Sequence, residues 1–205
     1  MANESHTVSL GFADQRFPAG AHICQIFSSD EERLDALLEF LRSGLEAGEK
    51  TACFTEKLDD AYFADYLAKH GLSCDKLKES GAVSIAGTRE AYFQDGRFDP
   101  DRMLGTLKQY HEASVTEGYP AARVIGEMTA DIGSISGGSR LMEYESRVSL
   151  LLKEHPVTAV CQYDANVFDG ATLMKVLKVH PLMVIRGAVV RNPCYIPPEE
   201  VLGTI

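Results

Sequence analysis

Basic residues are too few in this 205-residue chain to form a surface that binds nucleic acid. The sequence has 20 Lys and Arg against 30 Asp and Glu, which gives a net charge of −10. A protein that neutralises nucleic-acid phosphates needs clustered Lys and Arg. We therefore expect that this chain does not bind nucleic acid directly.

The sequence also lacks a long apolar run and an export signal. The N-terminal segment MANESHTVSLGF has no basic region followed by an apolar region. No apolar stretch approaches the roughly 20 residues that a helix needs to cross a bilayer. These absences predict a cytoplasmic protein with no membrane partner.

Closely paired cysteines are absent as well. The five cysteines are odd in number and contain no C-x-x-C pair. This spacing favours neither a disulfide framework nor a zinc knuckle. We expect mostly free thiols, and three of them lie in apolar runs where cysteine acts as a small hydrophobic residue. These three are Cys24, Cys53 and Cys161.

Apolar strand-like segments alternate along the chain with amphipathic helical segments. This alternation predicts an α/β domain with a mostly parallel sheet and crossover helices. The expected strands cover residues 22–27, 51–55, 81–87, 121–128 and 157–164, and the expected helices cover 30–47, 58–71, 101–117, 140–155 and 169–181. Residues 182–200 read as a closing hairpin with Gly187 in its turn. We expect residues 1–19 to form a tail and residues 20–202 to form one domain.

The connection between the first strand and the first helix is SSDEER, residues 28–33. Nucleotide-binding proteins of this type carry G-x-x-x-x-G-K-[ST] at this position, where main-chain N–H groups and a lysine hold the phosphates. Here there is no glycine and no lysine, and the three adjacent carboxylates would repel a triphosphate. The acidic run suits a solvated first helical turn, capped by Ser28 or Ser29. We expect no ATP hydrolysis.

Eight strings in order along the chain resemble the MEDS domain, a sensory domain named for methanogens, methylotrophs and the regulator DcmR. The strings are HICQIF, GLEAGEK, DGRFDPDRM, EGYPAARVIGEM, EYESRV, PVTAVCQYD, HPLMVI and NPCYIPPEE. The resemblance extends from Gly20 to Leu202. It implies a degenerate, three-layer RecA/KaiC-like fold without a functional phosphate loop. It also implies sensing of small molecules, including hydrocarbon derivatives, in bacterial or archaeal signal transduction or transcriptional regulation.

Polar side chains near the ends of the expected strands are the candidate ligand-binding residues. The carboxyl ends of parallel strands line a common crevice, so these side chains are expected to converge there. The candidates are His22, Cys24, Glu127, Cys161, Gln162, Asp164 and His180. The topology assigns no distances between them.

Each candidate has a structural alternative. His22 and His180 fit capping roles, in which an imidazole bonds a main-chain group at a strand or helix end. Cys24 and Cys161 fit buried, inert thiols. Glu127 could pair with Arg123. Asp164 could cap the helix that follows Ala165, and Gln162 could satisfy main-chain groups.

Three functions compete on this sequence. The first is a non-catalytic sensor that has no cofactor, binds a small molecule, and signals as a homodimer or to a separately encoded regulator or kinase. The second is a metal or haem sensor that uses His22, Cys24 and Cys161, with His180 as a further ligand. The third is an enzyme with Glu127 as base and Cys161 as nucleophile, but no side chain is placed to support this pair. We favour the first and expect no enzymatic activity.

Overall fold

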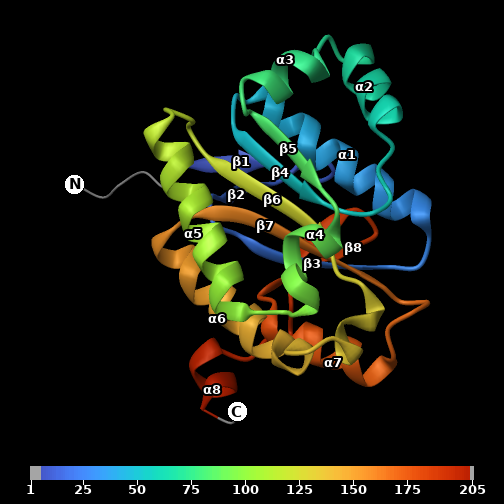
Figure 1. Ribbon diagram of the computed structural model, residues 1–205, viewed down its shortest axis with the longest axis vertical. Coiled ribbons are helices and arrows are strands. Elements are labelled where there is room, and N and C mark those ends of the chain that lie inside the picture. Colours follow the sequence, from blue (N-terminus) through green and yellow to red (C-terminus); the bar gives the residue numbers. More distant parts are fainter. Residues whose placement is uncertain (1–5, 204–205) are drawn as a thin grey trace.

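A seven-stranded sheet forms the centre of the molecule (Figure 1). The computed structural model describes residues 6–203. The strands lie in the order β5-β4-β6-β7-β3-β8-β9, and all neighbours are parallel except the last pair. The strands are β3 (His22–Phe27), β4 (Lys50–Phe54), β5 (Val83–Ala86), β6 (Ala122–Glu127), β7 (Val157–Asp164), β8 (Leu182–Ile185) and β9 (Ala188–Arg191). The mostly parallel α/β sheet and the closing hairpin predicted from the sequence are confirmed.

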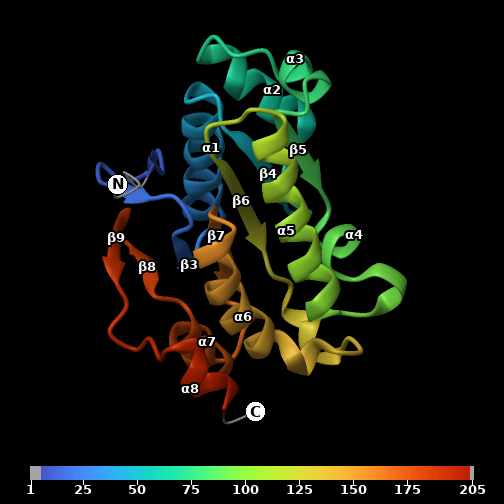
Figure 2. The ribbon, with the colours of Figure 1, turned by 90° about the vertical axis from the view of Figure 1, so that its left-hand side faces the viewer.

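Helices cover both faces of this sheet and complete three layers (Figure 2). One face, here called the α1 face, carries α1 (Asp30–Glu46), α2 (Asp60–Lys69) and α3 (Cys74–Glu79). The other, the α6 face, carries α4 (Thr88–Tyr92), α5 (Pro100–Thr116), α6 (Leu141–Glu154) and α7 (Gly170–Val179). The short helix α8 (Pro198–Leu202) packs against α6. All six residues of β6 are buried, as is usual for a strand covered on both sides.

Strand alternation divides the interior into two apolar cores. Ile23, Ile125 and Val160 point into the core under α1, whereas Val124 and Ala159 point into the core under α6. Successive side chains of a strand face opposite sides of the sheet, so one residue step moves a side chain from one core to the other. This rule decides which candidate residues meet.

The helix starts follow the capping residues in the sequence. Ser29 accepts a hydrogen bond from the Glu32 main-chain N–H at 3.1 Å and caps α1. Asp99 caps α5, whose first residue is Pro100. Asp169 caps α7.

Residues expected to form a tail are partly built into the fold. Strands β1 (Thr7–Ser9) and β2 (Arg16–Pro18) pair in an antiparallel hairpin. Val8 and Leu10 are fully buried in the core under α1. The burial of these two apolar side chains explains why the segment packs on the domain. Residues 1–5 of the expected tail lie outside the described residues.

The serine- and glycine-rich connection after β6 is packed rather than open. It contains two 3-10 turns, η2 (Ala130–Ser134) and η3 (Gly138–Arg140). A Cβ atom on Gly138 would lie 1.7 Å from the main-chain oxygen of Ile132, so only glycine fits there. The Phe98 N–H donates to the Ser136 carbonyl at 2.8 Å and ties this connection to the segment before α5. That segment contains the third such turn, η1 (Gln94–Gly96).

Candidate functional site

The predicted site residues lie on both faces of the sheet rather than in one crevice. Glu127 and Gln162 are paired in register between β6 and β7 and point to the α1 face. His22, Cys24 and Cys161 point to the α6 face, since Cys24 and Cys161 are neighbours in register between β3 and β7. The expectation of a single crevice overlooked strand alternation, which sends adjacent residues such as Cys161 and Gln162 to opposite sides.

On the α1 face, Glu127 lies in a group of matched charges. Its carboxylate accepts a hydrogen bond from Thr55 Oγ1 at 2.9 Å and pairs with Lys57 Nζ at 2.8 Å. Arg33 NH1 lies 3.7 Å from the same carboxylate, and the Arg33 side chain is fully buried. We call Arg33, Thr55, Lys57 and Glu127 the Arg33 cluster. Arg123, the alternative partner expected for Glu127, instead pairs with Glu49, because Arg123 lies near the start of β6 and Glu127 lies at its end.

Gln162 and Asp164 make internal contacts. The Gln162 side-chain amide donates to Gln25 Oε1 at 2.8 Å and to the Arg33 main-chain oxygen at 3.0 Å. Asp164 accepts from the Asn166 N–H at 2.9 Å and so stabilises the turn after β7. The capping role considered for Asp164 belongs to Asp169, because α7 starts five residues later than that reading required.

The connection between β3 and α1 lacks the residues of a phosphate loop. Only Ser28 and Ser29 separate the two elements, and Ser29 already caps the helix. The first-turn residues Asp30, Glu31 and Glu32 are exposed. Arg33 turns inward from this turn and reaches the end of β6. A protein side chain thus occupies the interior next to the position that a phosphate loop would take.

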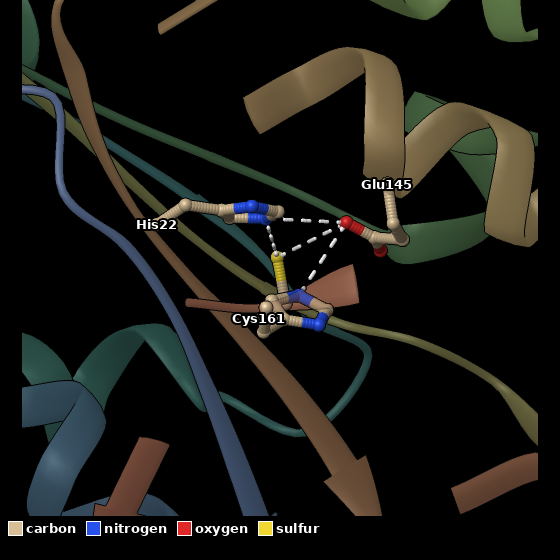
Figure 3. A group of neighbouring side chains, drawn as sticks. His22, Glu145 and Cys161 are labelled. Atoms are coloured by element: carbon tan, nitrogen blue, oxygen red, sulfur yellow. Dashed lines mark hydrogen bonds and ion pairs between the residues drawn. The ribbon is translucent and has the colours of Figure 1, made fainter. Parts of the chain in front are cut away.

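On the α6 face, four side chains from four segments converge on one point (Figure 3). His22 comes from β3, Glu145 from α6, Cys161 from β7, and His180 from the residue after α7. One donor atom from each lies within 4.8 Å of all the others. We call these residues the His–Cys–Glu cluster. His22, Cys161 and His180 are predicted site residues, and the structure adds Glu145.

Individual separations in the His–Cys–Glu cluster are short. Glu145 Oε2 lies 3.3 Å from His22 Nε2 and 3.5 Å from His180 Nε2. Cys161 Sγ lies 3.6 Å from His22 Nε2 and 3.8 Å from Glu145 Oε2. His22, Glu145 and His180 are buried, while Cys161 retains some accessible surface. In Figure 3 the carboxylate of Glu145 reaches toward both the His22 ring and the Cys161 sulfur.

Outer contacts hold the cluster in place. His180 Nδ1 lies 2.8 Å from the Val176 carbonyl oxygen, which can only accept, so Nδ1 carries the proton. His22 Nδ1 lies 2.8 Å from Ser149 Oγ, and that hydroxyl lies 3.4 Å from the Val179 carbonyl oxygen. The Tyr163 hydroxyl donates to Glu145 Oε1 at 2.6 Å.

Burial sets the protonation of the cluster. Burial, with help from the neighbouring His180, lowers the pKa of His22 to about 4. Burial raises the pKa of the Cys161 thiol well above its ordinary value, and the Glu145 charge raises it further. Burial alone would raise the pKa of Glu145, but contacts with His180 and His22 hold it below its usual range. At neutral pH the cluster therefore contains a carboxylate, a protonated thiol and a neutral His22.

The sequence does not mark Glu145 as a site residue, because it lies in an ordinary amphipathic helical pattern. Its neighbours on the same stripe of α6, Leu141, Val148 and Leu152, are buried and apolar. A carboxylate in such a stripe has a high desolvation cost unless it has a partner. The signal available in the sequence was the apolar spacing at 141, 145, 148 and 152, interrupted by one acid.

The enzyme hypothesis does not match this geometry. Glu127 and Cys161 point to opposite faces of the sheet, so the carboxylate cannot serve as base for that thiol. The raised pKa of Cys161 also keeps the thiol protonated.

A groove of about 640 Å³ lies beside the His–Cys–Glu cluster. It runs between α6, α7 and the segment that leads into α8, which lie together at one end of the molecule (Figures 1 and 2). Val179 forms part of its wall and precedes His180. A second groove of about 350 Å³ adjoins it and is bordered by the serine- and glycine-rich connection. Residues that line both are Ser139, Met142 and Lys175.

The family match decides how this arrangement is classified. Residues 21–181 match the MEDS family, the methanogen/methylotroph, DcmR sensory domain. The chain belongs to the MEDS family. The MEDS match includes every segment that supplies the His–Cys–Glu cluster and ends one residue after His180.

A curated relative supports the MEDS assignment. The transcriptional repressor DcmR of Methylorubrum extorquens is 23% identical over 160 residues, which cover 78% of this chain and 57% of the repressor. The chain thus matches little more than half of that relative's length.

The solved structures are archaeal. A KaiC-like protein of Pyrococcus horikoshii has a TM-score of 0.61 at 15% identity, covering 87% of this chain and 79% of its own. The flagellar accessory protein FlaH of Methanocaldococcus jannaschii has a TM-score of 0.60 at 12% identity, covering 91% and 84%. At such identities the likeness shows the fold alone, so the MEDS domain has the predicted RecA/KaiC-like fold. Within residues 6–203, no helix is both long and apolar enough to span a membrane.

Proposed function

We propose that this MEDS domain is a non-catalytic sensory domain that binds a small organic molecule and regulates a partner. The observation that carries the proposal is the match to a sensory-domain family over residues 21–181. Similarity to a transcriptional repressor supports a regulatory output. In this proposal the domain detects a compound and transmits the change in its own conformation.

The connection between β3 and α1 supports a role without ATP hydrolysis. Nucleotide hydrolysis in this fold depends on a phosphate loop that presents main-chain N–H groups and a lysine. Here the two-residue connection ends in the Ser29 cap, and the buried Arg33 side chain lies beside Glu127. A triphosphate would need both of these contacts to open.

We place the organic ligand in the groove beside α6, α7 and α8. Its volume of about 640 Å³ is within the usual range of roughly 300–1,000 Å³ for small-molecule sites. Apolar side chains line part of it, and charged residues stand among them, a lining that suits a small, mildly polar hydrocarbon derivative. The apolar lining residues include Met142, Val179 and Ile196, and the charged ones include Arg140, Glu143, Lys175, Lys178 and Glu200.

The candidate residues relate to this groove in different ways. His22, Cys161 and His180 are not among its lining residues, although Val179, which lines it, precedes His180, and Cys24 is next to Cys161 in the sheet. Direct contact between these residues and a ligand stays a prediction. It also stays a prediction for Glu127, Gln162 and Asp164, each of which has a partner within the domain, although Gln162 Oε1 has none.

Thermal unfolding with a panel of short halogenated and oxygenated hydrocarbons tests the ligand proposal. A compound at 100 times its Kd stabilises the fold by about 2.7 kcal/mol. At roughly 2–4 °C per kcal/mol for a chain of this size, Tm should rise by about 5–10 °C. Native mass spectrometry of the purified chain should reveal compounds that co-purify.

Matched substitutions locate the binding site. Met142→Trp fills the groove and should abolish the shift, whereas Met174→Trp, on the half-exposed side of α7, should preserve it. If no compound shifts Tm and nothing co-purifies, the sensor proposal fails. Loss of the shift in both variants would place the ligand elsewhere.

We further propose that the output passes through a second copy of this chain or a separately encoded regulator or kinase. The β8–β9 hairpin supports this, because it forms one sheet edge and exposes Ile185 and Val190. Edge strands with exposed apolar residues favour pairing with another chain. Light scattering should show a dimer, or a regulator should bind when ligand is present. A strict monomer that binds no regulator would contradict the proposal.

A further inference from the structure

The His–Cys–Glu cluster leaves one buried nitrogen without a hydrogen bond. His180 Nε2 has no hydrogen-bond partner, and the His180 side chain is fully buried. Because Nδ1 carries the proton toward Val176, a neutral ring presents a lone pair at Nε2. Nε2 lies 3.5 Å from Glu145 Oε2, so a proton on Nε2 or a cation between the two atoms is needed to satisfy both.

The second imidazole is held in the same way. When the Ser149 hydroxyl donates to the Val179 carbonyl, it accepts from His22 Nδ1–H, and His22 Nε2 then also presents a lone pair to the centre. Metal-binding histidines commonly donate their other ring N–H to a carbonyl or another outer acceptor, which fixes the ring. Both rings of the cluster have such an outer contact.

The separations match the edges of a tetrahedron around a metal ion. Bond lengths of about 2.0–2.1 Å for nitrogen and oxygen and about 2.3 Å for sulfur, at tetrahedral angles, place neighbouring donor atoms roughly 3.3–3.6 Å apart. The four short separations in the cluster are 3.3, 3.5, 3.6 and 3.8 Å. The other two pairs lie within 4.8 Å, so a small inward movement of His180 completes the shape.

The donor types select the metal. Two imidazoles, one thiolate and one carboxylate form a mixed set that suits Zn²⁺, and hard cations such as Mg²⁺ prefer oxygen alone. Four donor atoms this close surround a point and leave no plane for a porphyrin, so the set does not suit haem. Cys24 is not part of the set, although it is the neighbour of Cys161 in the sheet.

We propose that His22, Glu145, Cys161 and His180 bind one Zn²⁺ ion in a tetrahedral site that joins β3, β7, α6 and the end of α7. Binding releases the thiol proton to solvent, as thiolate coordination requires. The site goes beyond the organic-ligand proposal and does not depend on it. The ion fixes His180 and hence the Val179 wall of the groove.

The test uses the full chain, purified after growth with zinc and then stripped with a chelator. We expect one zinc per chain before stripping. Titration of the stripped protein with Co²⁺ should give visible bands of tetrahedral cobalt and a thiolate charge-transfer band. X-ray absorption of the zinc form should show one sulfur at about 2.3 Å and three nitrogen or oxygen neighbours at about 2.0–2.1 Å.

Two matched cysteine variants identify the ligand. Cys161→Ala should lose the charge-transfer band and weaken zinc binding by more than the roughly 10–100-fold that loss of an outer contact costs. Cys24→Ala should keep the band and the stoichiometry. Circular dichroism tests whether each variant is folded. If Cys161→Ala does not fold, X-ray absorption of the unaltered chain still shows whether one sulfur binds the metal.

Three results would overturn the proposal. The first is a chain that holds no stoichiometric zinc and gives no cobalt bands. The second is a spectrum that survives Cys161→Ala but not Cys24→Ala. The third is an absorption spectrum that requires two sulfur neighbours, which would bring Cys24 into the site. Metal content is measured without any organic compound, so failure of either proposal leaves the other testable.

Discussion

On the α1 face of the sheet the carboxylate of Glu127 is surrounded by donors, whereas on the α6 face the carboxylate of Glu145 faces two imidazoles and a thiol. Arg33, Lys57 and Thr55 supply Glu127 with opposite charge and a hydrogen bond. Glu145 accepts from the Tyr163 hydroxyl at 2.6 Å and from the Cys161 thiol at 3.8 Å. Both carboxylates are buried, so the contrast lies in their partners and not in their exposure.

The contrast shows that the two faces of the sheet differ in how their buried carboxylates are satisfied. The α1 face holds the position of a phosphate loop and has closed it with internal ion pairs. Buried charges that are paired need nothing from outside. The α6 face brings two imidazoles, a thiol and a carboxylate together, a donor set that can bind a cation. The candidate cation site therefore lies on the face of the sheet opposite the one covered by α1.

The largest expected effect on the unfolding free energy comes from a glutamate-to-glutamine substitution, made in separate variants on each face of the metal-free protein. Glu127→Gln removes the charge that neutralises buried Arg33 and should cost about 3 kcal/mol of unfolding free energy, the lower end for a broken buried pair, because Asp30 and exposed Lys57 remain. Glu145→Gln gives His180 Nε2 a donor and should change the unfolding free energy by less than about 1 kcal/mol. Urea unfolding with a constant m-value measures both.

Opposite results would remove the distinction between the faces. If Glu145→Gln costs as much as Glu127→Gln, a protonated imidazole pairs with Glu145 in the metal-free protein. The double variant Arg33→Met with Glu127→Gln should cost less than the sum of its single variants, because neither side chain is then left as an unpaired buried charge.

The sequence was sufficient to predict the sheet but not to predict which side chains contact one another. Short, largely apolar runs such as 22–27 and 157–164 coincide with β3 and β7, because a strand covered on both faces is mostly apolar. Neither run shows which side chains point toward the helices on each face of the sheet. Cys161 and Gln162 were therefore assigned to one crevice, although adjacent strand positions must face apart.

Local sequence patterns could not predict contacts between residues that are far apart in the sequence. Glu145 meets His22 across 123 positions, and Arg33 meets Glu127 across 94, and nothing near either residue signals the contact. The chain topology, in which β3 lies between β7 and β8, brings these segments together. The candidate histidines and cysteines were recognisable by type, but their common point depends on tertiary structure.

A smaller effect should follow from the outer contact of His22. Ser149→Ala removes the hydroxyl at 2.8 Å from His22 Nδ1 and frees the ring to rotate or change tautomer. Zinc affinity should fall about 10–100-fold, as is usual when such a contact is lost. Competition with a coloured chelator measures the affinity. Ser146→Ala is the control, because this buried serine on the same helix bonds only within α6, to Met142 O.

Equal losses in the two serine variants would show that helix stability, and not the orientation of His22, sets the affinity. An unchanged affinity in Ser149→Ala would show that Ser149 does not orient the ring. Neither result would alter the ion pairs of the α1 face, which share no residue with this contact.

The smallest expected effect concerns the cap at the start of α1. Ser29→Ala removes the hydrogen bond to the Glu32 N–H at 3.1 Å and should cost about 1 kcal/mol, a typical value for an N-cap serine. Ser28→Ala should stay within about 0.5 kcal/mol, as exposed substitutions usually do, since Ser28 contributes its main-chain oxygen to Asn166 and not its hydroxyl. Magnesium ATP should leave Tm unchanged in both variants and in the parent, because Arg33 and Glu127 remain paired behind the cap. A rise in Tm with ATP would mean that the α1 face has kept a nucleotide site, and the two faces would then differ in ligand rather than in openness.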